Sequence, residues 1–315
     1  EYLYDLGKDE GMTMLGANQD EFLSGDADKF CRLLYEMMGS TQQLNQMDFF
    51  KMAHIAYEKT LKNDLANKNT CFYHIHNPSP MAKLNFINHA PNARFLVMVR
   101  EPLQSCESWV RKPFLENDLE DVYKRIVTML MDIDQFIYRS YDSVGVRLED
   151  LKSQPEKTMA RISEWLGVKE EPIMYEMTAQ GRKWWGDPSS PNFGKTGMSL
   201  HGDETIKRRV GYFFDEQDQF ILHTLFYPFS VRFGYVDGNR ERFVSDLDSI
   251  KSLLEGPFGF EEKSVARSGI DIEEQVKSGP AMYFRVALKE RWKVLNEFYD
   301  YPSMLTPLDV NIISE

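Results

Sequence analysis

Two residues placed eight positions apart, Arg100 and Ser108, have the side chains needed to bind an anion. Arg100 follows the apolar run 95–99, which is typical of a strand buried on both faces of a parallel sheet. Pro102 suits the first turn of a helix, because its missing N–H costs nothing there. Open α/β folds bind phosphate where a strand leads into a helix, so Arg100 and Ser108 could bind one phosphate together. A structural ion pair is an equally reasonable interpretation of Arg100.

Basic and aromatic residues gather further along the chain, in residues 179–211. Loops of this length inside a compact domain are usually functional or disordered, and two adjacent tryptophans argue against disorder. Trp184 and Trp185 could stack on a ligand through their ring faces, or they could be buried structural residues. Three consecutive cations could bind an anion or form a solvated basic face: Lys207, Arg208 and Arg209.

Apolar periodicity predicts the elements that position these residues. We expect strands at 70–75, 95–99 and 143–148, with helices between them. This order predicts right-handed β–α–β units and therefore an α/β fold, with a central parallel sheet flanked by helices. A long helix is expected at 118–141. Another begins near Pro155 with a capping box from Ser153 and ends at Gly167.

The chain is predicted to have two parts. Residues 1–236 would form the α/β domain, and residues 237–315 a helical C-terminal extension packed on it. Apolar residues at helical spacing predict helices around 247–254 and 282–299, with a loop at 256–280 between them.

Three segments together resemble sulfotransferases that use 3′-phosphoadenosine 5′-phosphosulfate (PAPS). Arg-x-Pro with Ser108 eight positions after the arginine resembles the family's 3′-phosphate-binding segment. Residues 146–151 (VRLEDL), with Trp165-Leu166-Gly167 ending the next helix, resemble the strand, E-D-L turn and F-L-G signature. Residues 73–78 (YHIHNP) are similar to the K-T-H-L-P segment of the cytosolic enzymes. The resemblance covers roughly residues 70–236.

This resemblance implies a three-layer fold like that of the phosphate-loop nucleoside triphosphatases, and sulfuryl transfer from PAPS to a hydroxyl or amine. Arg100 and Ser108 would bind the 3′-phosphate, assisted by the cluster at 207–209, which is similar to the family's R-K-G-x-x-G segment. His76 corresponds to the catalytic base, a role that suits an imidazole because it titrates near neutral pH. A strand-end histidine bonded to a backbone carbonyl is the alternative. His74 stands where the cytosolic enzymes carry a lysine, and would either replace that cation or pack. Trp184 and Trp185 could gate the acceptor or stack on adenine.

Two family features are not recognisable in these 315 residues. One is the P-K-S-G-T-T-like phosphate loop that holds the 5′-phosphosulfate, which we expect to lie upstream of Glu1. The alternative is a degenerate member of the family without the loop. The other is the tyrosine of the Y-E-D-L turn, replaced here by Leu148.

Composition narrows the remaining possibilities. The formal net charge of −12 argues against a nonspecific nucleic-acid binder, and no apolar run approaches the roughly 20 residues of a membrane span. The three cysteines and six histidines have no metal-ligand spacing, so no metal is expected. The absence of disulfide spacing favours a reducing, cytoplasmic location. The acceptor, a small molecule or a carrier-bound group, cannot be read from the sequence, and neither can the oligomeric state.

Two other functions compete with the enzyme interpretation. The first is a non-catalytic nucleotide- or sulfate-binding scaffold derived from a sulfotransferase. The second is a phosphoryl transferase, which ranks lower because no Mg²⁺-binding arrangement is recognisable.

Overall fold

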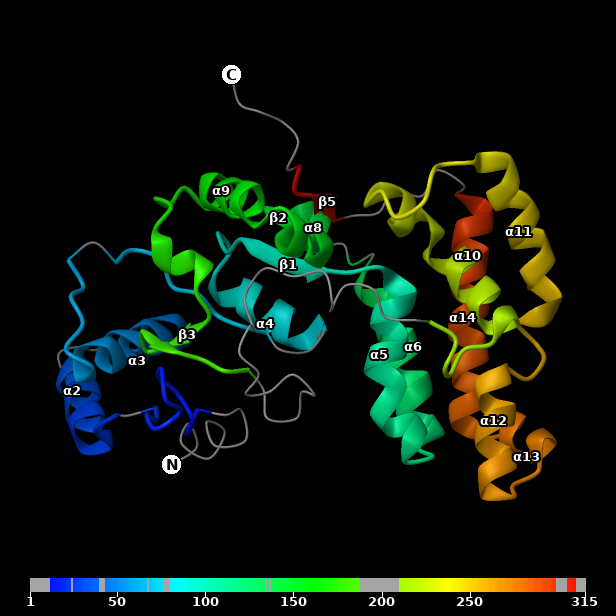
Figure 1. The fold of residues 1–315 in the computed structure, drawn as a ribbon, viewed down its shortest axis with the longest axis horizontal. Coiled ribbons are helices and arrows are strands. Elements are labelled where there is room, and N and C mark those ends of the chain that lie inside the picture. The colour runs from blue at the N-terminus through cyan, green and yellow to red at the C-terminus, as the bar shows by residue number, and fades with distance from the viewer. Residues whose placement is uncertain are drawn as a thin grey trace. The chain divides into compact units, whose positions relative to one another are not determined.

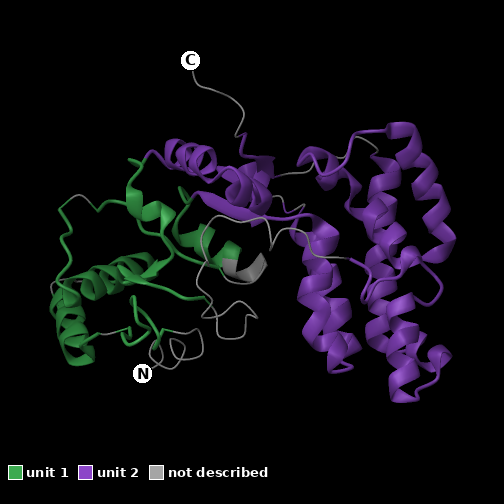
Figure 2. Ribbon diagram, in the orientation of Figure 1, with its two compact units in different colours: residues 1–77, 81–93, 168–201 green, residues 78–80, 94–167, 202–315 purple. Residues whose placement is uncertain are grey.

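A computed structural model describes most of the chain, namely residues 12–23, 25–39, 43–66, 68–75, 80–133, 135, 137–186, 210–298 and 305–309. These residues fall into two compact units (Figure 2). Unit 1 comprises residues 1–77, 81–93 and 168–201, and unit 2 comprises residues 78–80, 94–167 and 202–315. The boundary expected at residue 236 stays a prediction.

The central sheet of unit 2 is parallel, as expected, with strand order β1-β2-β5. β1 is Phe95–Val99 and β2 is Ser143–Arg147, paired in register so that Val99 lies opposite Arg147. β5, Thr306–Pro307, adds a short third strand beside β2. Helices flank this sheet (Figure 1), so the expected α/β class with a central parallel sheet is confirmed.

The helices next to the sheet begin and end at residues with clear capping roles. α5, Pro102–Leu115, begins with proline in its first turn, and α9, Pro155–Leu166, ends at Gly167 with a left-handed φ of 69°. The intervening helices are α6 (Leu119–Asp132), α7 (Ile137–Ser140) and α8 (Leu148–Ser153). The capping box expected at Ser153 is wrong: the Ser153 hydroxyl donates to the Glu149 carbonyl, one turn back in α8.

Three other sequence predictions need correction. Residues 70–75 form no strand, and Cys71, expected in a buried strand, is exposed. The single helix expected at 118–141 is two helices, α6 and α7. The expected loop at 256–280 contains α12, Gly259–Ser268, and α13, Ile272–Val276. Apolar periodicity missed these two because they are short and carry many charges.

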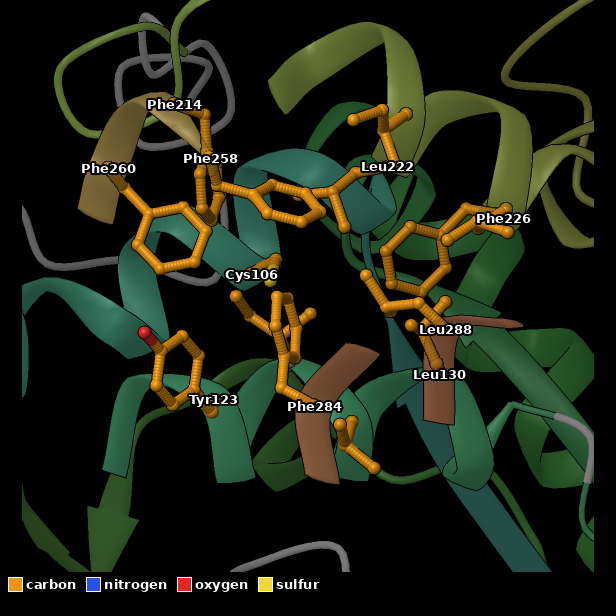
Figure 3. Packing of buried hydrophobic residues seen from close by; sticks show 14 of the residues in the cluster. Cys106, Tyr123, Leu130, Phe214, Leu222, Phe226, Phe258, Phe260, Phe284 and Leu288 are labelled. Carbon is orange, nitrogen blue, oxygen red and sulfur yellow. The ribbon is translucent and has the colours of Figure 1, made fainter. Parts of the chain in front are cut away.

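A single hydrophobic cluster holds the helices of unit 2 together. It joins α5 and α6 to α10 (Glu216–Arg232), α11 (Arg240–Leu253), α12 and α14 (Gly279–Glu297). Aromatic rings fill its centre (Figure 3), where Phe284 lies 4.9 Å from Tyr123 and 5.2 Å from Phe258 between ring centroids. The hydrophobic cluster that holds α5 in place therefore consists of residues from both sides of position 236 in the sequence.

Unit 1 is built from shorter pieces. Its helices are α2 (Ala27–Gly39), α3 (Gln46–Thr60), most of α4 (Pro80–His89) and the 3₁₀ turn Pro172–Tyr175. A hairpin of β3 (Thr178–Ala179) and β4 (Arg182–Lys183) completes it. The hairpin turn has positive φ at Gln180 and Gly181, which suits glycine at the second position.

Candidate functional site

The carboxyl end of β1 brings Arg100 and Ser108 to one side of α5. Arg100 follows the last residue of the strand, and its Nη2 donates to Gln104 Oε1 at 3.0 Å. Gln104 and Ser108 are four residues apart in α5, so they lie on the same face of the helix. The guanidinium is thus directed along the face that carries the serine, and both side chains remain partly accessible. This donor set fits a phosphate, which accepts from guanidinium and hydroxyl groups alike.

The N-terminus of α5 is already capped by a carboxylate. Glu101 accepts from the backbone N–H of Leu103 at 3.1 Å and of Gln104 at 2.7 Å. An anion could not use these two N–H groups without displacing Glu101. The predicted phosphate ligands, Arg100 and Ser108, do not depend on these two N–H groups, and their role stays a prediction.

A second carboxylate, Glu149 in the first turn of α8, joins three segments beside Arg100. Its Oε1 accepts from the backbone N–H of Glu101 at 3.1 Å, and its Oε2 accepts from the Tyr235 hydroxyl at 3.0 Å. The Arg147 guanidinium lies 4.8 Å from the centre of the Tyr235 ring and forms an ion pair with Asp150 at 3.6 Å. Glu149 and Asp150 thus connect the first turn of α8 to the neighbouring residues Glu101, Tyr235 and Arg147.

A third carboxylate, Glu107, is buried next to Ser108 in the sequence. It accepts from the backbone N–H of Gly211 at 2.8 Å and of Phe213 at 2.7 Å. Gly211 has a φ of 114°, which favours glycine, and Lys263 Nζ donates to the Phe213 carbonyl at 2.9 Å. α5 therefore holds the segment that directly follows the predicted basic cluster. The cluster itself, Lys207, Arg208 and Arg209, lies outside the described residues.

The predicted base, His76, and the nearby His74 lie in the sequence range of unit 1. His76 lies outside the described residues, and His74 is exposed. Tyr73 stacks on Phe86 with ring centroids 5.3 Å apart while its own side chain is 53% exposed. The role of catalytic base that the resemblance implies for His76 therefore stays a prediction.

The two tryptophans of unit 1 differ in environment. Trp185 is buried, its indole N–H donates to the Gly16 carbonyl at 2.6 Å, and Lys183 Nζ lies 3.6 Å from its ring centre. Trp184 is partly exposed, and its backbone N–H donates to the Met177 carbonyl at 2.8 Å. Of the two, Trp185 therefore fits better the alternative that these tryptophans are buried structural residues.

Burial shifts the pKa of Tyr235 and of two side chains of α8. Desolvation and the nearby Glu149 raise the pKa of Tyr235, which keeps its hydroxyl protonated as a donor at neutral pH. Desolvation also raises the pKa of Asp150, and it lowers the pKa of Lys152. Within the part of the chain that the structure describes, no group of three histidine, cysteine or acidic side chains is arranged to hold a metal ion. The described helices likewise include none with the length and apolarity needed to cross a membrane.

Sequence reasoning missed three residues near Arg100. Gln104 has a readable signal, since it stands four positions from both Arg100 and Ser108. Glu107 and Tyr235 have none, because their partners are the backbone of residue 211 and the side chain of residue 149. Only the folded chain brings these groups together.

Comparison with known proteins identifies the family. The model of the sulfotransferase family matches residues 10–172, which include β1, Arg100, Ser108 and the E-D-L turn. The chain therefore belongs to the sulfotransferase family, as its sequence motifs indicated. Searches of curated proteins and of solved structures find no match.

Proposed function

We propose that this protein transfers the sulfuryl group of PAPS to a hydroxyl or amine of a small-molecule or carrier-bound acceptor in the cytoplasm. The observation that supports this most directly is the alignment of Arg100, Gln104 and Ser108 along one face of α5. In a member of the sulfotransferase family, this face is suited to the 3′-phosphate of the nucleotide. Lys207, Arg208 and Arg209 would assist.

The reaction needs one proton acceptor and one stabilised leaving group. The acceptor oxygen forms a bond to sulfur as the bond between sulfur and the phosphate oxygen breaks. His76 would take the hydroxyl proton during this step, because an alcohol is a poor nucleophile while it keeps its proton. Negative charge that develops on the leaving phosphate needs donors already in place. Trp184, Trp185 and His74 would contact the acceptor.

A thermal-shift titration tests the cofactor. We expect 3′-phosphoadenosine 5′-phosphate (PAP) to stabilise the protein by about 2.7 kcal/mol at about 100 times its dissociation constant, and AMP to do far less. The Arg100→Ala variant should lose the response to PAP. Arg94→Ala is the matched control, since Arg94 precedes the same strand and pairs with Asp142 at 2.6 Å.

The outcome separates the two functions that the sequence left open. Equal stabilisation of wild type and Arg100→Ala would contradict the assignment of Arg100. Stabilisation by PAP without sulfuryl transfer to any phenol, alcohol or amine in an acceptor screen would favour the non-catalytic scaffold. Turnover that His76→Ala abolishes while PAP binding persists would support the enzyme and its base.

A further inference from the structure

The Arg100–Glu101 peptide is held by a chain of two hydrogen bonds that begins far away in the sequence. The Tyr235 hydroxyl donates to Glu149 Oε2 at 3.0 Å, and Glu149 Oε1 accepts from the Glu101 N–H at 3.1 Å. A peptide unit is planar, so fixing the N–H of Glu101 also fixes the carbonyl of Arg100. The backbone of Arg100 therefore loses one of its two soft dihedral angles as long as Glu149 stays in place.

Glu149 has a competing partner nearby. The Arg147 guanidinium contacts the same Tyr235 ring, at 4.8 Å from its centre, and lies two residues before Glu149 in the chain. A carboxylate released by the tyrosine could turn towards this cation and abandon the Glu101 N–H. A hydrogen bond to an ionised carboxylate is stronger than one between neutral groups, so the Tyr235 hydroxyl, at 3.0 Å from Glu149 Oε2, is suited to prevent this.

Tyr235 is itself held firmly at the end of α10. Gly234 adopts a φ of 67°, and the Tyr235 N–H donates to the Ser230 carbonyl at 2.8 Å. The ring lies 6.4 Å from the Phe229 ring, and Phe229 is buried. The position of the hydroxyl thus depends on the packed helices of unit 2 rather than on a surface loop.

We propose that Tyr235 and Glu149 are positioning residues for the nucleotide site, because they hold the Arg100–Glu101 peptide and so direct the Arg100 guanidinium along α5. Neither residue needs to touch the nucleotide. This inference rests on the proposed binding of the 3′-phosphate by Arg100, and it adds to the site a residue that lies outside every motif of the sequence. Tyr235 lies beyond residues 10–172, to which the family match extends.

The test removes the hydroxyl and keeps the ring. Tyr235→Phe should weaken PAP binding by about tenfold, the effect expected when one hydrogen bond to a charged group is lost. It should raise the KM for PAPS with little change in kcat or in the KM for the acceptor, and it should speed amide hydrogen exchange at Glu101. Tyr227→Phe is the matched control, because its hydroxyl accepts from the Asn239 N–H and its ring stacks on Phe243.

Substitution of Glu149 adds a rescue experiment. In Glu149→Gln the amide oxygen can still accept from the Glu101 N–H and the amide nitrogen can donate to the tyrosine oxygen, so we expect most PAP affinity to remain. Glu149→Ala should lose as much affinity as Tyr235→Phe or more, and the double variant should lose less than the sum of the two losses.

Three results would overturn the inference. PAP affinity and Glu101 exchange unchanged in Tyr235→Phe would show that the chain of bonds does not position Arg100. Equal losses in Tyr235→Phe and Tyr227→Phe would indicate general destabilisation. Wild-type protein that does not bind PAP would remove the proposed function itself, and the inference with it.

Discussion

The two compact units differ in the size of the buried hydrophobic core that supports their candidate functional residues. Among the described residues, unit 2 contains the aromatic cluster of Figure 3, with Phe258, Phe260 and Phe284 fully buried. The buried hydrophobic residues described in unit 1 are Leu15, Ala56, Ile87 and Trp185. Unit 1 also exposes large aromatic side chains, such as Phe72 at 64% and Tyr73 at 53%.

This difference matches a division of tasks. Arg100 and Ser108, which recognise the unchanging nucleotide in the proposed function, lie on the densely packed unit. His74, Trp184 and Trp185, which would meet the acceptor, lie on the unit with the smaller described core. Interfaces that adapt to different ligands draw on regions of lower local stability, whereas a fixed ligand favours a rigid frame. Four experiments probe the buried structure and the candidate residues of the two units.

The largest expected effect comes from the centre of the aromatic cluster. Phe284→Ala should lower the free energy of unfolding by about 3–5 kcal/mol, because it removes a buried ring and leaves a cavity. The matched change in unit 1, Phe72→Ala, should cost no more than about 0.5 kcal/mol, since that ring is mostly in solvent. Urea unfolding of both variants measures the difference. Similar losses of unfolding free energy in the two variants would contradict this expectation.

Glycine substitutions give the next largest contrast. In Gly145→Ala the new Cβ would lie 2.5 Å from Phe233 Cζ and 2.9 Å from Leu305 Cδ2. Both neighbours are buried, so we expect a loss of about 1–3 kcal/mol from overpacking. In the hairpin of unit 1, a Cβ at Gly181 meets nothing within 4 Å, and its φ of 73° leaves only backbone strain of about 1 kcal/mol. Thermal unfolding of the two variants would contradict the comparison if Gly181→Ala were the more harmful.

A smaller effect depends on pH. Burial raises the pKa of Asp218 to about 7, although the N–H groups of Gly259 and Phe260 donate to its carboxylate and oppose the shift. The unfolded chain releases this proton near pH 3.9, so the native state holds more protons between pH 4 and 7. The contribution of Asp218 to stability is therefore largest below pH 4 and falls as pH rises towards 7.

Comparison of wild type with Asp218→Asn isolates this contribution. Between pH 5 and pH 7 the wild type should lose about 1–2 kcal/mol more than the variant, measured by urea unfolding at each pH. The absolute stability of the variant is a separate matter, because an amide cannot accept from both backbone donors with its two terminal atoms. Parallel pH profiles would show that Asp218 is ionised in the native protein across this range.

The smallest effect on stability should come from His74. His74→Ala should change the free energy of unfolding by less than about 0.5 kcal/mol, because the side chain is exposed. Under the proposed function it should reduce turnover or raise the KM for the acceptor and leave PAP affinity unchanged. His223→Ala, an exposed histidine of α10, is the control. A loss of PAP affinity in His74→Ala would remove the division of tasks between the units.

Local patterns in the sequence predicted β1, the start of α5 and the end of α9 well. The strand at 95–99, the helix that begins at Pro102 and the left-handed end at Gly167 are all confirmed, because each depends on neighbouring residues. The placement of Arg100 on the same face as Ser108 follows from these local rules. The confirmed family assignment rested on three segments together, Arg100 to Ser108, residues 146–167 and residues 73–78.

The errors arose where distant residues decide the structure. Residues 70–75 alternate like a strand, but residues 70–74 are exposed and the segment pairs with none of the described strands. The short helix α12 contributes Phe260 to the hydrophobic cluster, a contact that local periodicity does not reveal. Ser153 bonds back into α8 because the preceding turn is already helical. Glu107 and Tyr235 could not be assigned, since their partners are distant in the sequence: the backbone of residues 211 and 213 for Glu107, and the Glu149 side chain for Tyr235.

Because the short strand β5 is synthesised long after β1 and β2, the sheet is completed late in translation. β1 and β2 leave the ribosome early, but Thr306 and Pro307, which pair with Val144 and Gly145, are synthesised about 160 residues later. At translation rates of about 5–20 residues per second, the edge of β2 waits roughly 10–30 seconds for its neighbour. During that interval β2 presents unpaired backbone groups, a surface to which other extended chains can add. A chaperone that shields nascent strands would therefore help this protein most in the interval before Thr306 and Pro307 are made.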